Sequence, residues 1–133
     1  MIIEPIEKWT GIEIYYADGS ILVTNLAAWN SCPTEEVQIV KLINGNYSQL
    51  IMNYDTYAVW SEGDNLIIVQ CGPTSTYGHS QKVELRPDGN TIVTDFEIES
   101  ASAELNTKIS ENSKSGSLID YDDYLAILEE ATE

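Results

Sequence analysis

The sequence predicts a mainly β protein in which antiparallel hairpins form a bent sheet, a small sandwich or a partial barrel, with one C-terminal helix. Four turn signals separate runs rich in β-branched and aromatic residues, which is typical of successive hairpins. One convincing amphipathic pattern at helical spacing lies near the C-terminus. The 133 residues match one ordinary domain, so we expect a single domain over residues 1–133. An α+β fold is the alternative.

The clearest hairpin spans residues 11–24 around Asp18-Gly19. Both turn residues tolerate positive φ, which predicts a type I′ turn and a register that pairs Tyr15 with Leu22. Five apolar side chains then share one face, which we expect to be core: Ile12, Ile14, Tyr16, Ile21 and Val23. Tyr15 and Leu22 share the other face, where they either pack or contact a partner.

Three more hairpins follow along the chain. The expected strand pairs are residues 37–43 with 47–53, 56–60 with 65–71, and 81–85 with 91–98. The second hairpin turns at Asn44-Gly45, and its register is expected to place Ile39 opposite Leu50. The run LIIVQ in the third hairpin is apolar enough to predict a central strand covered on both faces. The fourth turns at residues 86–90, where proline and glycine favour a type I turn followed by a left-handed residue.

The last predicted strand has two different faces. One carries Ile92, Thr94, Phe96 and Ile98, and the other carries an acidic row of Asp95, Glu97 and Glu99. Residues 99–117 are mostly small and polar, which predicts either a flexible segment or a short helix. In the helical alternative Ser100 is the N-cap, and Ala101, Leu105 and Ile109 form an apolar stripe.

Residues 120–131 carry the convincing helical pattern. Asp120 can cap the first turn, and Asp122 and Asp123 lie where the helix dipole favours carboxylates. The apolar face is expected to dock on the sheet through Tyr121, Tyr124, Leu125 and Leu128.

The charge of the chain restricts its partners. There are 22 acidic and 6 basic side chains, for a formal net charge of −16. Such a charge opposes direct binding to nucleic acid phosphates or to anionic lipid, and it favours a basic protein partner. Two other interpretations of the charge are plain solubility and adaptation to high salt.

The composition also indicates a compartment. No charged and then apolar leader opens the sequence, and no run approaches the roughly 20 apolar residues that span a bilayer. Cys32 and Cys71 are far apart and lie outside any C-x-x-C pair, so two reduced thiols are expected. We therefore expect a cytoplasmic protein without membrane contact.

No motif predicts an enzyme, a cofactor or a metal, and none of the three is expected. His79 is the only histidine, and no nucleophile motif accompanies it. A zinc site from Cys32, Cys71 and His79 lacks paired ligand spacing. Phosphate-binding glycine loops are absent from the sequence. Carboxylate pairs are uninformative in so acidic a chain.

Several short motifs follow one another along the chain: Tyr16-x-Asp18-Gly19, Trp29, Pro33, Val37-Gln38, Asp55-x-Tyr57-x-x-Trp60, Gly116-x-x-Ile119 and Asp122-Asp123-Tyr124. Their order resembles that in a group of small phage and prophage proteins of unknown function. The resemblance covers residues 12–60 and 116–131, and it departs from the group between residues 66 and 109 and at Ser117. It implies a viral or mobile-element origin and brings no catalytic residues.

The charge and the resemblance together lead to a functional hypothesis. A non-enzymatic phage-type protein would bind a basic surface of a host protein that handles nucleic acid, in the host cytoplasm, and would compete there with phosphates. The candidate contact residues are Asp95, Glu97, Glu99, Asp120, Asp122, Asp123, Tyr15 and Leu22. The alternative is a carbohydrate-binding or virion accessory module that uses exposed Tyr15, Tyr77 or Trp29.

Overall fold

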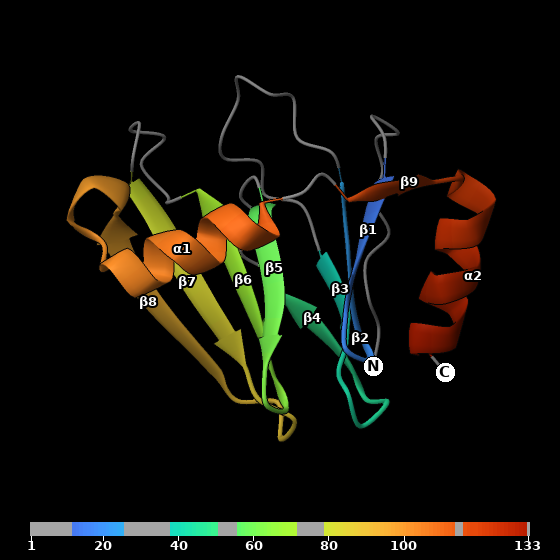
Figure 1. Ribbon diagram of the computed structural model, residues 1–133. Helices are drawn as coiled ribbons and strands as arrows, with labels where there is room; N and C mark the ends of the chain where they lie inside the picture. Colours follow the sequence, from blue (N-terminus) through green and yellow to red (C-terminus); the bar gives the residue numbers. More distant parts are fainter. Residues whose placement is uncertain (1–11, 26–37, 51–55, 72–78, 114–115, 133) are drawn as a thin grey trace.

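The computed structural model describes residues 12–25, 38–50, 56–71, 79–113 and 116–132, and Figure 1 shows their arrangement. The strands are β1 (Ile12–Ala17), β2 (Ser20–Asn25), β3 (Gln38–Lys41), β4 (Tyr47–Leu50), β5 (Thr56–Glu62), β6 (Asn65–Cys71), β7 (His79–Leu85), β8 (Thr91–Glu97) and β9 (Ser117–Ile119). The helices are the 3₁₀ turn η1 (Ile98–Ser100), α1 (Ala103–Asn112) and α2 (Tyr121–Thr132). The fold is mainly β, as predicted.

The strands form two antiparallel sheets. Sheet A has the order β4-β3-β2-β1-β9, and sheet B has the order β5-β6-β7-β8. Sheet B is a simple meander, because each strand pairs with the next one along the chain. Sheet A differs only at one edge, where β9 from near the C-terminus pairs with β1.

The turn and the register of the first predicted hairpin are confirmed. Asp18 has φ 46° and Gly19 has φ 90°, as a type I′ turn requires. Tyr15 pairs with Leu22, and Ala17 pairs with Ser20 across the turn. Local turn chemistry therefore sets the register of β1 and β2.

The second hairpin has a different register from the one predicted. Ile39 pairs with Gln49 instead of Leu50. The amide of Gly45 donates to the Leu42 carbonyl at 2.9 Å, and Gly45 alone has positive φ, at 88°. This geometry is a type I turn followed by a left-handed glycine, which needs one residue more than the predicted loop and shifts the pairing by one.

The third and fourth hairpins confirm their predictions. Every residue of the LIIV segment of β6 is fully buried, as expected for a central strand between β5 and β7. In the fourth turn the Gly89 amide donates to the Arg86 carbonyl at 2.9 Å, and Gly89 has φ 89°. Glu97 continues the acidic row of β8, whereas Glu99 lies beyond the strand in η1.

The two sheets pack face to face over one apolar cluster. Its members are Tyr15, Leu22, Val40 and Leu42 from sheet A and its β3–β4 turn, and Val59, Leu66, Ile68, Val83 and Leu85 from sheet B. Two side-chain hydrogen bonds also connect the hairpin tips of the two sheets. Ser61 donates to a carboxylate oxygen of Asp18, and the Asn44 amide donates to the Pro87 carbonyl at 2.8 Å. The arrangement is a sandwich, one of the three predicted forms of the sheet.

Helix α2 covers the outer face of sheet A (Figure 1). The buried cluster there joins Ile12, Ile14, Val23 and Ile39 to Tyr124 and Ala131 of the helix, with Ile127 and Leu128 packed beside them. The predicted apolar face was wrong at Tyr121 and Leu125, which are 38% and 39% exposed. Two stripes of α2 have helical spacing, and the sheet covers the more C-terminal one.

Helix α1 confirms the helical alternative for residues 99–117. Its N-cap is Ser102, whose hydroxyl accepts from the Leu105 amide at 3.1 Å, instead of the predicted Ser100. Leu105 and Ile109 pack on the outer face of sheet B. The cluster there includes Trp60, which is buried.

Candidate partner-binding site

Tyr15 and Leu22 are not accessible to a partner. They are 9% and 0% exposed and belong to the cluster between the sheets. The Tyr15 hydroxyl donates to Oε2 of Glu13 at 2.9 Å, inside the protein. Their proposed role as contact residues needs correction, because sheet B covers the face of β1 and β2 that carries them. The prediction that Tyr16 belongs to the core was also wrong, because this residue near the turn is 71% exposed and lies outside the apolar cluster under α2.

The six candidate carboxylates are all exposed, but they fall into two separate groups. The first group, the β8 acidic row, comprises Asp95 and Glu97 on β8 and Glu99 in η1. The second group, the α2 acidic cluster, comprises Asp120, Asp122 and Asp123 at the start of α2. Figure 1 shows β8 and α2 at opposite flanks of the molecule. One partner surface of ordinary size would therefore contact one group and not both.

The α2 acidic cluster has a sufficient structural explanation. Asp122 and Asp123 lie in the first turn of α2, and the Tyr124 amide donates to the Asp120 carbonyl at 3.0 Å. Carboxylates in a first helical turn are stabilised by the unpaired amides and the positive end of the helix dipole. The position of these residues needs no partner to account for it.

The β8 acidic row has no such explanation, and one of its members is held in place. The Gln81 amide nitrogen donates to Oδ1 of Asp95 at 3.0 Å, and the Gln81 amide oxygen accepts from Nε2 of Gln70 at 3.2 Å. Gln70 and Gln81 are buried. This chain of hydrogen bonds crosses β6, β7 and β8 and orients a surface carboxylate from inside the sheet.

Cations do not neutralise the β8 acidic row within the described ranges. The ion pair in the described ranges joins Nζ of Lys41 in β3 to Oε1 of Glu130 in α2 at 3.8 Å and does not involve β8. Lys82 is the neighbour of Thr94 across the β7–β8 ladder, so its side chain leaves the sheet on the face opposite to Asp95. Among the described residues, the carboxylates of the row therefore have no ion pair.

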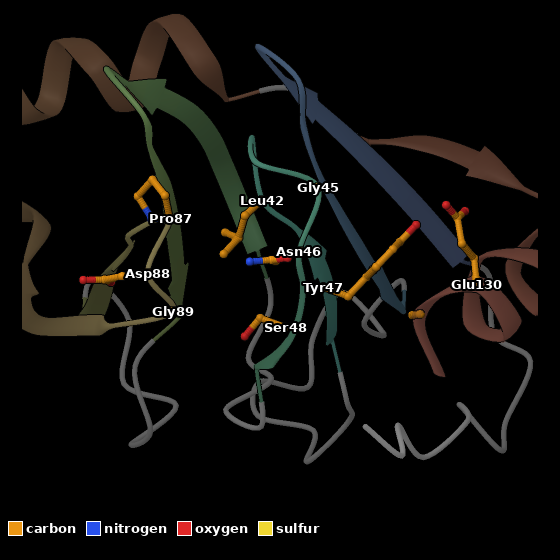
Figure 2. Close-up of a pocket in the computed structure, with 10 residues that line it drawn as sticks. Leu42, Gly45, Asn46, Tyr47, Ser48, Pro87, Asp88, Gly89 and Glu130 are labelled. Carbon is orange, nitrogen blue, oxygen red and sulfur yellow. The ribbon is translucent and has the colours of Figure 1, made fainter. Parts of the chain in front are cut away.

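A groove lies between the hairpin tips and the end of α2, and its volume is about 490 Å³. Figure 2 shows Pro87, Asp88 and Gly89 on one side of it and Glu130 on the other. Asn46 and Ser48 add polar groups between them. Three segments remote in sequence form this groove, so no sequence pattern could have predicted it.

Tyr47 is the aromatic side chain of the groove, and Figure 2 shows it directed toward Glu130. The pKa of Tyr47 is raised from 10.0 to about 12, mainly by burial and also by a hydrogen bond to Glu130 and by the negative charge of that residue. Nζ of Lys41 lies 5.4 Å from the centroid of the Tyr47 ring. One face of the ring is therefore already occupied by a cation.

The described part of the chain offers no assembled metal centre, since no three His, Cys, Asp or Glu side chains gather there as ligands. The zinc site considered from Cys32, Cys71 and His79 is not tested, because Cys32 and the side chains of Cys71 and His79 lie outside what the structure describes. Trp29 and Tyr77 also lie outside the described residues. No helix of the described ranges is long and apolar enough to cross a membrane.

Comparison of the chain with protein-family models, with curated proteins and with solved structures found no match.

Proposed function

We propose that this protein acts by binding, and that its β8 acidic row engages a basic surface of a protein that handles nucleic acid. The observation that carries the proposal is the exposed row of Asp95, Glu97 and Glu99, which has no cation partner among the described residues. Arginines and lysines that normally hold phosphates are the chemical complement of such a row. A bound carboxylate row would block those side chains and inhibit the partner by competition.

The overall charge supports this choice of partner. With 22 acidic against 6 basic side chains, the long-range field attracts cations and repels nucleic acid. Association would be fast at low salt and would weaken as salt screens the charges. The resemblance to phage and prophage proteins leads us to propose further that the partner is a host defence or regulatory factor in the host cytoplasm.

The proposal is tested by comparing two charge variants with each other and with the wild type. The first changes Asp95→Asn, Glu97→Gln and Glu99→Gln, and the second changes Asp120→Asn, Asp122→Asn and Asp123→Asn. Each removes three negative charges, so the two variants have the same net charge. The proteins would be immobilised and used to capture basic nucleic-acid-binding proteins from a bacterial lysate at low and high salt, with mass spectrometry to identify them.

The expected result is that wild type and the α2 variant capture the same partner at low salt, whereas the β8 variant does not. Added duplex DNA should compete with the capture, because it uses the same cations of the partner. Equal loss in both variants would show that only net charge matters, and failure of the wild type to capture any basic protein at either salt would contradict the proposal.

The groove supports a second candidate function, the binding of a carbohydrate. The groove combines an aromatic ring with hydroxyl, amide and carboxylate groups, which is the chemistry that binds polyols. These groups belong to Tyr47, Ser48, Asn46, Asp88 and Glu130. A glycan array with wild type and Asp88→Ala would test it. Signals that depend on Asp88 are expected if the groove is the site, and an array without any signal would exclude this function.

A further inference from the structure

Strand β8 forms the outer edge of sheet B. β8 is the last strand of the order β5-β6-β7-β8, and no described residue pairs with its other side. All of its residues except Phe96 are exposed, including Val93, whose exposed fraction is 38%. Strand edges of this kind present unpaired amides and carbonyls to any extended chain that approaches.

The other edges are less open to pairing. In sheet A, β4 has four residues and β9 has three, which leaves little backbone to pair with. β5 has seven residues, but its register is interrupted between Thr56 and Ala58, and α1 and β1 lie against it. β8 has seven residues in uninterrupted register with β7 and contains neither lysine nor proline, the residues that commonly protect an edge.

The register identifies the backbone groups at the free edge. The Arg86 amide donates to the Asn90 carbonyl at 2.9 Å, so Arg86 and Asn90 form a hydrogen-bonded pair next to the turn. Hydrogen-bonded and non-hydrogen-bonded pairs alternate along an antiparallel ladder. The amides and carbonyls of Thr91, Val93, Asp95 and Glu97 consequently point away from β7, toward the free edge.

These four residues also place their side chains on one face of the sheet, because successive positions alternate. Val93 lies on this face beside its neighbour Val83, and Asp95 lies there beside Gln81. A strand added at the edge would therefore meet outward backbone groups and the side chains of Val93, Asp95 and Glu97 in the same register. Asp95 is presented with one oxygen already held by Gln81.

We propose that the free edge of β8 accepts an extended basic segment of a partner protein as a fifth strand of sheet B. This inference rests on the proposed function, because it identifies how the β8 acidic row docks on its partner. Main-chain hydrogen bonds to β8 provide the attachment, as in other strand additions. Lysine or arginine at alternate positions of the added strand, opposite Asp95 and Glu97, provides the selectivity.

Charge complementarity decides the occupant. A second copy of this chain has a net charge of −16 as well, so its approach to the same edge is opposed. A basic strand gains two opposite-charge neighbours on the face of Asp95 and Glu97, while its alternate side chains lie over Ile92 and Phe96. The edge is thus protected against self-association by the same carboxylates that attract a basic segment.

The test measures binding of the full chain to a fluorescent peptide as long as β8, Lys-Val-Lys-Val-Lys-Val-Lys, by fluorescence anisotropy. Two control peptides are a block isomer with all lysines at one end and a form with every backbone amide N-methylated, which keeps the lysine charges but cannot donate main-chain hydrogen bonds to β8. The alternating peptide should bind about tenfold or more tightly than either control.

Two variants test the β8 side. Val93→Pro removes an amide that points outward and makes no bond to β7, and Val93→Thr retains that amide as a matched control. Binding of the alternating peptide should weaken about tenfold or more with Val93→Pro and stay within about twofold with Val93→Thr. Asp95→Asn with Glu97→Gln should weaken it about threefold to tenfold at low salt and much less at high salt.

The outcomes separate this inference from the proposed function. Strand addition is excluded if the N-methylated peptide binds as tightly as the alternating peptide and if Val93→Pro binds the alternating peptide as tightly as Val93→Thr does. Electrostatic capture of folded basic proteins would then remain possible. The comparison of the two peptides tests strand addition even if Val93→Pro does not fold. Absence of binding to the alternating peptide also overturns the inference, and so does a wild-type dimer in sedimentation that Val93→Pro abolishes, since the occupant would then be a second copy.

Discussion

A β-carbon at position 116 would lie 2.9 Å from Cε2 of Tyr15 and 3.0 Å from Cβ of Glu13. Gly116 precedes β9, and Tyr15 lies in β1, the strand that β9 pairs with. The tyrosine ring therefore occupies the space of the missing side chain. This contact gives a physical reason for glycine in the Gly116-x-x-Ile119 motif, because the close approach positions β9 at the edge of sheet A.

The first prediction follows from this contact. Gly116→Ala should lower the free energy of unfolding by about 1–3 kcal/mol, since either the ring or the β9 backbone must move. Chemical denaturation would measure it. In a Tyr15→Leu background the same change should cost clearly less, and a double-mutant cycle without such coupling would show that the ring is not the obstacle.

The second prediction concerns the buried face of α2. Leu128→Ala should destabilise the protein by about 1–3 kcal/mol because it removes apolar contacts with sheet A, whereas Leu125→Ala should cost less than about 1 kcal/mol. The two substitutions are chemically identical and lie in one helix, so helix propensity cancels in their comparison. Thermal unfolding of both variants would measure the difference, and the reverse order would contradict the assigned face.

The third prediction concerns the pKa of Tyr47. The folded protein retains the phenol proton up to about pH 12, whereas the phenol of the unfolded chain ionises near 10.0. The contribution of Tyr47 to the free energy of unfolding should therefore be constant below about pH 10 and should decrease as the pH rises toward 12.

Denaturant unfolding at several alkaline pH values would measure this dependence. Tyr47→Phe should reduce the loss of stability between pH 10 and 12 relative to wild type. Tyr16→Phe is a suitable control, since Tyr16 is a largely exposed tyrosine of sheet A. Identical alkaline profiles for wild type and Tyr47→Phe would contradict the raised pKa.

The fourth prediction concerns the hydrogen-bonded chain below Asp95. Gln81→Ala should lower the free energy of unfolding by about 1–3 kcal/mol, because the fully buried Gln70 loses the acceptor of its amide. It should also weaken binding of a basic strand, because Asp95 loses the group that orients it. Denaturation and the anisotropy assay would measure the two effects.

A matched variant keeps the fourth prediction specific. Gln81→Glu retains the acceptor for Gln70 but removes the donor to Asp95 and adds a negative charge beside it. Its loss of stability should therefore arise from carboxylate repulsion and should shrink at low pH, whereas that of Gln81→Ala should not. Equal pH profiles for the two variants would contradict the hydrogen-bond arrangement.

Several elements of this fold follow from the sequence alone, because their causes are local. The turn at Asp18-Gly19 determined its own type and register. The apolar run of β6 required cover on both faces, and it has that cover. The four hairpins and the C-terminal helix could be predicted for the same reason: turn residues and the periodicity of apolar side chains act within a few positions.

Other elements were decided by contacts between segments far apart in the chain. Strand β9 has three residues, too few for a periodic pattern, and it exists because β1 offers an edge and Gly116 permits close approach. The shift in the second hairpin depends on a single additional residue in the turn. Both stripes of α2 had suitable spacing, and only docking on sheet A selected between them.

The sequence by itself determined which residues are acidic, where the chain turns and which runs must be covered. The tertiary structure decided what is exposed: it placed Tyr15 and Leu22 between the sheets, separated the β8 acidic row from the α2 acidic cluster, and left the edge of β8 without a partner strand among the described residues. The physical reason is that burial depends on what packs against a side chain, and that partner comes from elsewhere in the chain.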